Sequence, residues 1–266
     1  MGQHHVRSRP LTEATFAEVD PIKALQFYVD RMANAAGYTF AIVGTVKLEE
    51  LKPLVERYIA SLPAGTPENF RVVGADKPKG VVERTVRKGA EPKANTHFIF
   101  SGPAVYAPEN RFAMRALNEL VQMRLDQVLR EQLGGTYSPQ IYGALSRAPR
   151  AEFEEHIEYG SSPENVDKLS KSVLQIIDSL QRIPPSQAEV DKVKEQILRA
   201  REVETKTNDY WAANLVTRDR SGEDIGGLGA AYDSLVKGLT AAQLQDAAKK
   251  YFPVTNYAKF VLLPEK

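Results

Sequence analysis

An arginine and a tyrosine that flank a pair of glycines are the residues of this sequence whose types and spacing most clearly suggest chemistry. The stretch from Leu129 to Ser138 reads L-R-E-Q-L-G-G-T-Y-S, which places Arg130 before the glycines and Tyr137 after them. Because glycine adopts positive φ at little cost, the chain can turn at this point and bring Tyr137 back towards Arg130. One guanidinium with five N–H donors and one phenol would then share a surface, so the expected chemistry is hydrogen-bond donation.

A long amphipathic helix is expected to position Arg130. Apolar residues recur before it at mostly three- and four-residue spacings, the pattern of a helix face that is buried. The stripe consists of Phe112, Ala116, Leu117, Leu120, Val121, Val128 and Leu129. A structural explanation of the pair also exists, because a cation near a helix C-terminus gains ~0.3 to 1 kcal/mol from the helix dipole and a tyrosine is common at the start of a strand. Spacing alone therefore leaves both explanations open.

The decapeptide and its surroundings resemble the C-terminal half of the insulysin and pitrilysin type zinc peptidases, the inverzincins. Members of that family carry L-R-E-x-x-G-x-x-Y-S or close relatives of it. Tyr38 to Val46 (Y-T-F-A-I-V-G-T-V), followed by Leu48 to Pro63, is similar to the strand, glycine, helix and linker of the same family. The similarity of pattern therefore runs over most of the chain.

The resemblance implies specific roles for the two residues. Arg130 would donate to a backbone carbonyl of a peptide substrate, and Tyr137 would donate to the scissile carbonyl oxygen as negative charge develops on it. In this family the zinc lies opposite them, bound by an H-x-x-E-H helix and a more distant glutamate. The histidines here are His4, His5, His97 and His156, none of them four residues from another. The expectation is that this chain binds no metal and is inactive alone, and that the zinc lies in a partner half.

Other candidate sites in the sequence are weaker. His156 stands among Glu152, Glu154, Glu155 and Glu158, but strand alternation puts these side chains on opposite faces, so a solvated acidic strand is favoured over a metal site. His97 is expected to be a satisfied strand histidine. The basic cluster around Lys77 and Arg84 is interspersed with acidic residues and is expected to be solvated. Gly227-Leu228-Gly229 lies between predicted helices and is interpreted as a turn.

Composition excludes only a few classes of function. The 266 residues are 42% hydrophobic and 26% charged, which is ordinary for a globular chain. With 35 basic and 34 acidic residues, the charge gives no sign of a nucleic-acid or anionic-membrane surface. The absence of cysteine excludes disulfides and thiolate chemistry. These properties leave the compartment open, and the resemblance to exported bacterial peptidases suggests the periplasm.

The periodicities predict an α+β fold, an antiparallel sheet with helices packed on one face. Strands are expected at 38–46, 81–88, 96–101, 136–146, 151–159 and 259–263, and helices at 22–33, 48–61, 108–133, 164–182, 187–206, 208–219 and 240–251. Leu11-Thr12, a helix and Tyr38 recur as Leu239-Thr240, a helix and Tyr257, a faint repeat. We therefore expect residues 1–66 to be the C-terminal tail of a preceding homologous domain plus a linker, and 67–266 to be a complete inactive peptidase-like domain.

Three interpretations of function follow. The first is a non-catalytic, substrate-binding C-terminal half of a zinc-dependent endopeptidase, whose partners are a zinc-bearing half and a peptide substrate. The second is a catalytically inactive relative that serves as a structural or protein-interaction subunit. The third is an unrelated α+β binding module. Retention of both Arg130 and Tyr137 favours the first, because a purely structural relative has no reason to keep both.

Overall fold

A computed structural model describes residues 2, 4–67, 72–74, 76–136 and 138–265. The chain forms two compact units. One contains Gly74–Ala200 and the C-terminal stretch from Ala231, and the other contains His4–Val73 and Arg201–Ala230. Each unit is described by itself. The predicted boundary between a tail at 1–66 and a domain at 67–266 stays a prediction.

The first unit is built on one five-stranded sheet. The strands are β1 (Val81–Arg87), β2 (Ala94–Pro103), β3 (Gln140–Ser146), β4 (Glu152–Ser161) and β5 (Tyr257–Leu263), in the order β1-β5-β2-β4-β3. The predicted fold class is confirmed, with one correction to the antiparallel sheet: β5 is antiparallel to β2 but parallel to β1. The reason is the chain path, since β5 arrives last and inserts between two strands that run in opposite directions. It must be parallel to one of them.

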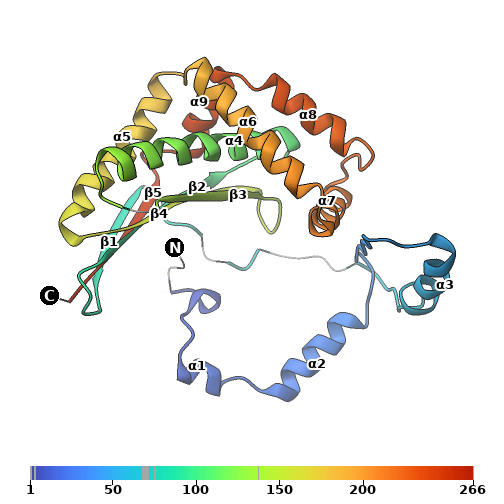
Figure 1. Cartoon of the computed structure of the whole chain (residues 1–266). Coiled ribbons are helices and arrows are strands. Elements are labelled where there is room, and N and C mark those ends of the chain that lie inside the picture. Colours follow the sequence, from blue (N-terminus) through green and yellow to red (C-terminus); the bar gives the residue numbers. More distant parts are fainter. Residues whose placement is uncertain (1, 3, 68–71, 75, 137, 266) are drawn as a thin grey trace. The chain divides into compact units, whose positions relative to one another are not determined.

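Helices cover one face of this sheet. Figure 1 shows α4 (Pro108–Leu125), α5 (Val166–Arg182) and α9 (Ala241–Tyr251) arching over the strands. An apolar stripe of α5, which includes Leu169, Val173, Ile177 and Leu180, is buried and packs into one core with Phe98 and Phe100 of β2. This unit also contains the π-helix Asp126–Gln132 and the 3-10 turn Pro163–Asn165. Most of α6 (Gln187–Glu204) and of α8 (Leu228–Gly238) belongs to it as well.

Local sequence signals explain several helix ends. Thr240 and Gln243 form a reciprocal capping box at the start of α9, which was predicted as a helix over 240–251. Ser186 and Glu189 exchange hydrogen bonds in the same way before α6. Of the stretch at 227–229 that was predicted to be a turn, Gly227 lies in a turn, but α8 begins at Leu228 and includes Gly229. The intrinsic cost of glycine in a helix is only ~1 kcal/mol, which packing can offset.

The second unit contains short helices, most of which leave their apolar faces exposed. Its helical elements are the 3-10 turn Val6–Ser8, α1 (Glu13–Ala17), α2 (Pro21–Met32), α3 (Leu48–Tyr58) and α7 (Asn208–Ser221). No residue of α2 is buried, and Ile22, Leu25 and Phe27 are more than 60% exposed. A segment this short cannot bury its own apolar side, which accounts for the exposed faces.

The strand predicted at 38–46 is not formed. No ladder among the described residues includes this segment, although Tyr38, Phe40, Ile42 and Val46 keep the alternating exposure of a strand that has one unpartnered face. A β-strand needs a neighbour to satisfy its backbone groups, and the described residues of this unit offer none. The segment therefore shows the predicted alternation of exposed residues, but it does not form the paired strand that was predicted.

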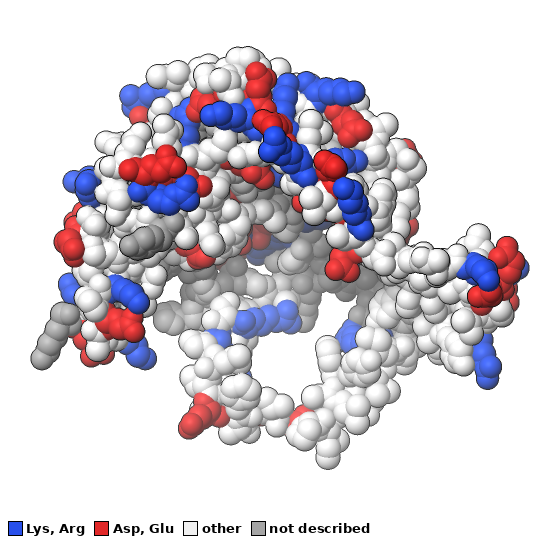
Figure 2. Space-filling view, in the orientation of Figure 1, with Lys and Arg blue, Asp and Glu red and all other residues white. Residues whose placement is uncertain are grey.

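The surface charges are mixed. On the side shown in Figure 2, basic and acidic side chains are interspersed over the helical layer of the first unit. Among the described residues, no helix has the length and apolar character needed to cross a membrane.

Candidate functional site

Arg130 lies in the last turn of a helix that changes its hydrogen-bonding pattern just before it. The helix is α up to Leu125 and π from Asp126 to Gln132. Such π segments are rare and are often found at functional sites. The side chain of Arg130 is 47% exposed, and its guanidinium nitrogens lie 3.2 Å from Asp126 Oδ1 and 3.3 Å from Glu131 Oε1. Among the described residues these two carboxylates of its own turn are its ion-pair partners, and a half-exposed guanidinium can exchange them for another acceptor at small cost.

The two glycines after this helix have different roles. Gly134 has φ +57°, and its N–H donates to the carbonyl of Arg130, which closes the helix as the sequence predicts. Gly135 does not need positive φ, but a Cβ there would lie 2.7 Å from Cδ2 of the buried Leu169 in α5. Gly135 therefore serves close packing, whereas Gly134 serves the turn.

The chain then returns along α4 to begin β3. The side-chain amide of Gln122 donates to the carbonyl of Pro139 at 2.8 Å and accepts from the backbone N–H of Ile141 at 3.2 Å. These bonds fix the start of β3 against the helix that carries Arg130. Tyr137, the second predicted site residue, lies in this segment but outside the described residues, so its distance from Arg130 stays a prediction.

A groove borders the segment between Gly134 and Ser138. Its volume is about 500 Å³, and its walls include the ends of β2 and β4. Most of the residues that line it are small, among them Ala94, Gly135, Gly160 and Ser161. Small side chains leave backbone groups accessible, so an extended chain could follow this groove past Gly134 and Gly135.

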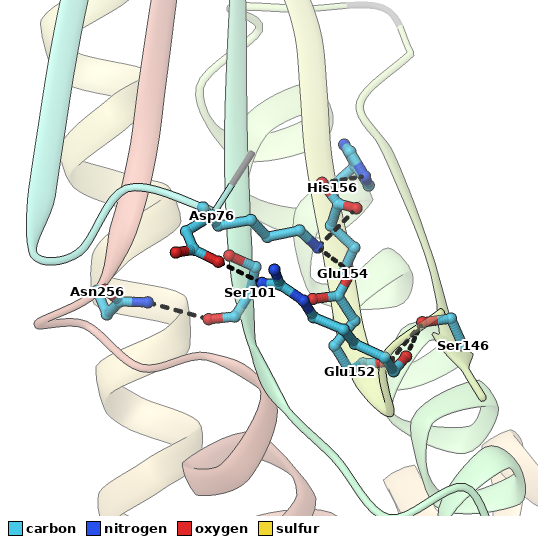
Figure 3. A network of polar contacts seen from close by, with 9 residues as sticks. Asp76, Ser101, Ser146, Glu152, Glu154, His156 and Asn256 are labelled. Carbon is cyan, nitrogen blue, oxygen red and sulfur yellow. Dashed lines mark hydrogen bonds and ion pairs between the residues drawn. The ribbon is translucent and has the colours of Figure 1, made fainter. Parts of the chain in front are cut away.

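The face of the sheet that the helices leave uncovered carries polar residues. Glu152, Glu154, His156 and Glu158 alternate along β4 with side chains of the core. Figure 3 shows Glu152, Glu154 and His156 within one polar network, in which Lys77 Nζ lies 3.2 Å from Glu152 and 3.0 Å from Glu154. Lys77 is thus paired rather than solvated, contrary to the prediction for the basic cluster.

His97 and His156 form a pair on this face. Nε2 of His97 lies 2.9 Å from Nδ1 of His156, so the two rings share a hydrogen bond, as expected for a satisfied strand histidine. Burial lowers the pKa of both rings, and the nearby glutamates oppose that shift. Two zinc ligands at about 2.0 to 2.1 Å in tetrahedral geometry would stand farther apart, so the pair does not fit that metal. No cluster of three or more metal-ligating side chains occurs among the described residues.

Glu155 departs from the predicted solvated acidic strand. It points to the helix-covered side of β4, is fully buried, and burial raises its pKa to about 8. Neither carboxyl oxygen makes a well-formed hydrogen bond within the described residues, although the Asn118 side chain lies near enough to oppose part of the shift. Gly143 of β3 makes room for this carboxyl, because a Cβ there would collide with it. Strict alternation with Phe153 and Ile157 is the signal that could have predicted its burial.

Comparison with known proteins decides the family. The family described as the peptidase M16 inactive domain matches residues 22–197. The chain belongs to this family. This confirms the resemblance to the non-zinc half of the insulysin and pitrilysin type peptidases.

Individual relatives agree with this assignment. The chain is 24% identical to a zinc protease PQQL-like protein of Arabidopsis thaliana over 287 residues, which cover 97% of this chain and 30% of that protein. It is 26% identical over 272 residues to the probable zinc protease PqqL of Escherichia coli, covering 97% of this chain and 28% of the relative. The crystal structure of the periplasmic protease PqqL from Escherichia coli superposes with a TM-score of 0.78 at 22% identity and shows the same fold over 97% of this chain and 29% of that one. The chain therefore spans less than a third of the length of these relatives.

Proposed function

We propose that this chain is the non-catalytic, substrate-binding half of a zinc-dependent endopeptidase, and that it contributes Arg130 and Tyr137 to the active chamber. The observation that carries the proposal is the Arg130 turn within a peptidase M16 inactive domain: a half-exposed guanidinium in a π segment that is followed by two glycines, Gly134 and Gly135, which line an open groove. Neither Arg130 nor Tyr137 can activate water, because that step needs a base and the metal. Their task is to donate hydrogen bonds to a peptide that the zinc-bearing half cleaves.

Residues 1–66 are assigned, within the same proposal, to the tail of a preceding homologous domain. The apolar side chains of α2 and the alternating exposed residues from Tyr38 to Val46 support this assignment, since within the part of the chain that the structure describes they lack the partners that α9 and β5 have in the first unit. We place the parent protein in the periplasm, because PqqL of Escherichia coli, which has the same fold, is a periplasmic protease.

The alternative is an inactive relative that serves as a structural or protein-interaction subunit. It accounts for the absence of the H-x-x-E-H motif equally well. It gives no reason for an exposed arginine and a tyrosine to flank the Gly134–Gly135 turn, since Gly134 closes the helix and Gln122 holds the strand without them.

The proposal is tested by zinc content and cleavage. The purified chain, prepared without an affinity tag, is expected to retain no stoichiometric zinc after dialysis and to cleave no peptide. Mixed with the H-x-x-E-H half of the parent peptidase, it is expected to restore cleavage of a quenched fluorescent peptide. Close to one zinc per chain, measured by elemental analysis, would refute the non-catalytic role. A zinc half that cleaves equally well without this chain would favour the structural role.

A further inference from the structure

The two edges of the sheet differ in how they are protected against pairing. Among the described residues, β1 pairs only with β5 and β3 only with β4, so both are edge strands. β1 carries Glu83, Arg84 and Arg87, which is the usual protection of an edge, whereas β3 reads Q-I-Y-G-A-L-S and has neither charge nor proline. The edge of β3 is therefore suited to accept another strand.

A groove accompanies β3 on the face that the helices leave open. It has a volume of about 360 Å³ and is lined by Tyr142 and Ser146 of β3, Glu152, Glu154 and His156 of β4, and Lys77. The rings of Tyr142 and His156 stack with centroids 4.9 Å apart. The walls of the groove are thus a strand edge, an aromatic pair and two carboxylates.

The carboxylates of this groove already hold an ammonium group. Lys77 comes from the segment before β1, outside the strands that build the groove, and its Nζ lies between Glu152 and Glu154. With Glu158 next along β4, three carboxylates face this side of the strand and Lys77 neutralises only one charge. Of the other charged neighbours, Arg150 pairs with Asp76, and burial lowers the pKa of His97 and His156, which disfavours their cationic forms. The groove therefore complements positive charge.

We propose that the edge of β3 and this groove dock an extended peptide segment and hold one of its lysine or arginine side chains against Glu152 and Glu154. The peptide backbone would extend the sheet beyond β3, and the basic side chain would take the place of the Lys77 ammonium, beside the Tyr142 ring. Because β3 begins shortly after Tyr137, a peptide on this edge continues from the proposed Arg130 and Tyr137 site. The inference rests on the proposed function and adds a substrate class to it, namely peptides with a basic residue.

The test is peptide binding to the chain itself, followed by fluorescence anisotropy at about 0.15 M salt. The probe is a labelled Thr- and Val-rich nonapeptide with one central lysine. It is compared with a peptide that has a central glutamate and with two lysine peptides N-methylated at the odd or at the even positions. One N-methylated peptide loses the N–H groups that would pair with β3, and the other keeps them. Asp178→Asn removes a similar exposed carboxylate on the helical side and is the control.

Two variants are expected to change the affinity for the lysine peptide in opposite directions. Glu154→Gln should weaken binding of the lysine peptide by about three- to tenfold, whereas Lys77→Ala, which frees the carboxylates, should strengthen it by about fivefold. Asp178→Asn should leave it unchanged, and only one of the two N-methylated peptides should bind poorly. Circular dichroism shows whether each variant is folded, and Glu152→Gln replaces Glu154→Gln if the latter is not.

Three outcomes would overturn the inference. These are no binding of the lysine peptide, equal binding of the lysine and glutamate peptides, and unchanged affinity in both the Glu154 and Lys77 variants. Since the measurement needs neither zinc nor cleavage, its failure leaves the roles of Arg130 and Tyr137 standing. Conversely, loss of those roles would leave a positive binding result intact.

Discussion

Replacement of Tyr137 by phenylalanine is expected to lower the turnover of the parent peptidase by about a hundred- to a thousandfold, with a smaller change in peptide binding. The hydroxyl is proposed to stabilise negative charge that appears only in the transition state, and loss of one such donor is typically worth ~2.7 to 4 kcal/mol. Arg130→Ala should also raise KM, because its guanidinium would bind a carbonyl of the ground-state substrate. Steady-state cleavage of a quenched fluorescent peptide by the complete enzyme measures both effects.

The matched control for these variants is Gln127→Ala. Gln127 is exposed in the same π segment, and a substitution there should change stability by no more than about 0.5 kcal/mol and leave turnover unaltered. Melting temperatures followed in parallel separate lost chemistry from lost folding. If both Arg130→Ala and Tyr137→Phe keep wild-type turnover in a folded enzyme, the pair has only structural roles.

Glu155→Gln is expected to stabilise the protein at alkaline pH by several kcal/mol while changing little at pH 4.5. The carboxyl is fully buried with a pKa of about 8, against 4.5 in the unfolded chain. Below pH 4.5 the carboxyl is protonated in both the folded and the unfolded state, so it carries no penalty in the free energy of unfolding. Between 4.5 and 8 only the unfolded state releases the proton, so stability falls as pH rises, by up to ~1.4 kcal/mol per pH unit, and the penalty is constant above pH 8. Glutamine stays neutral throughout.

Urea denaturation of wild type and Glu155→Gln at several pH values between 4.5 and 9 measures this difference. Glu158→Gln is the control, because Glu158 lies on the opposite face of the same strand, where its carboxylate contacts the Tyr142 hydroxyl at 3.3 Å. The control should follow the wild-type pH dependence. A constant difference between Glu155→Gln and wild type across this range would show that the carboxyl is ionised in the folded state as readily as in the unfolded chain. That outcome contradicts the burial argument.

The sequence predicted most of what depends on local periodicity. The stripe of α4, the helices predicted at 164–182 and 240–251 and the strand residues that alternate on β4 are all found in the structure. The exit of the helix at Gly134 was also predictable, because few residues other than glycine adopt that backbone conformation without strain.

What the sequence did not predict depends on contacts between distant segments. The parallel pairing of β1 with β5 follows from where the last strand inserts, and Tyr38–Val46 has strand periodicity but no ladder among the described residues. The ion pairs of Lys77 with Glu152 and Glu154 join two segments that are far apart in the sequence, so no local pattern predicts them. The π segment around Arg130 likewise leaves no periodic signature, since its apolar residues fit an α-helix equally well. Local sequence patterns therefore could not predict these features, which are seen only in the folded structure.

The most direct test of the proposed function is a structure of the parent peptidase, with the glutamate base of its zinc half changed to glutamine and a peptide bound in the chamber. We expect an Arg130 nitrogen about 3 Å from a peptide carbonyl oxygen and the Tyr137 hydroxyl directed at the scissile carbonyl on the side away from the zinc. A peptide out of hydrogen-bond reach of both residues, with Arg130 still paired to Asp126 and Glu131, would contradict the proposed function.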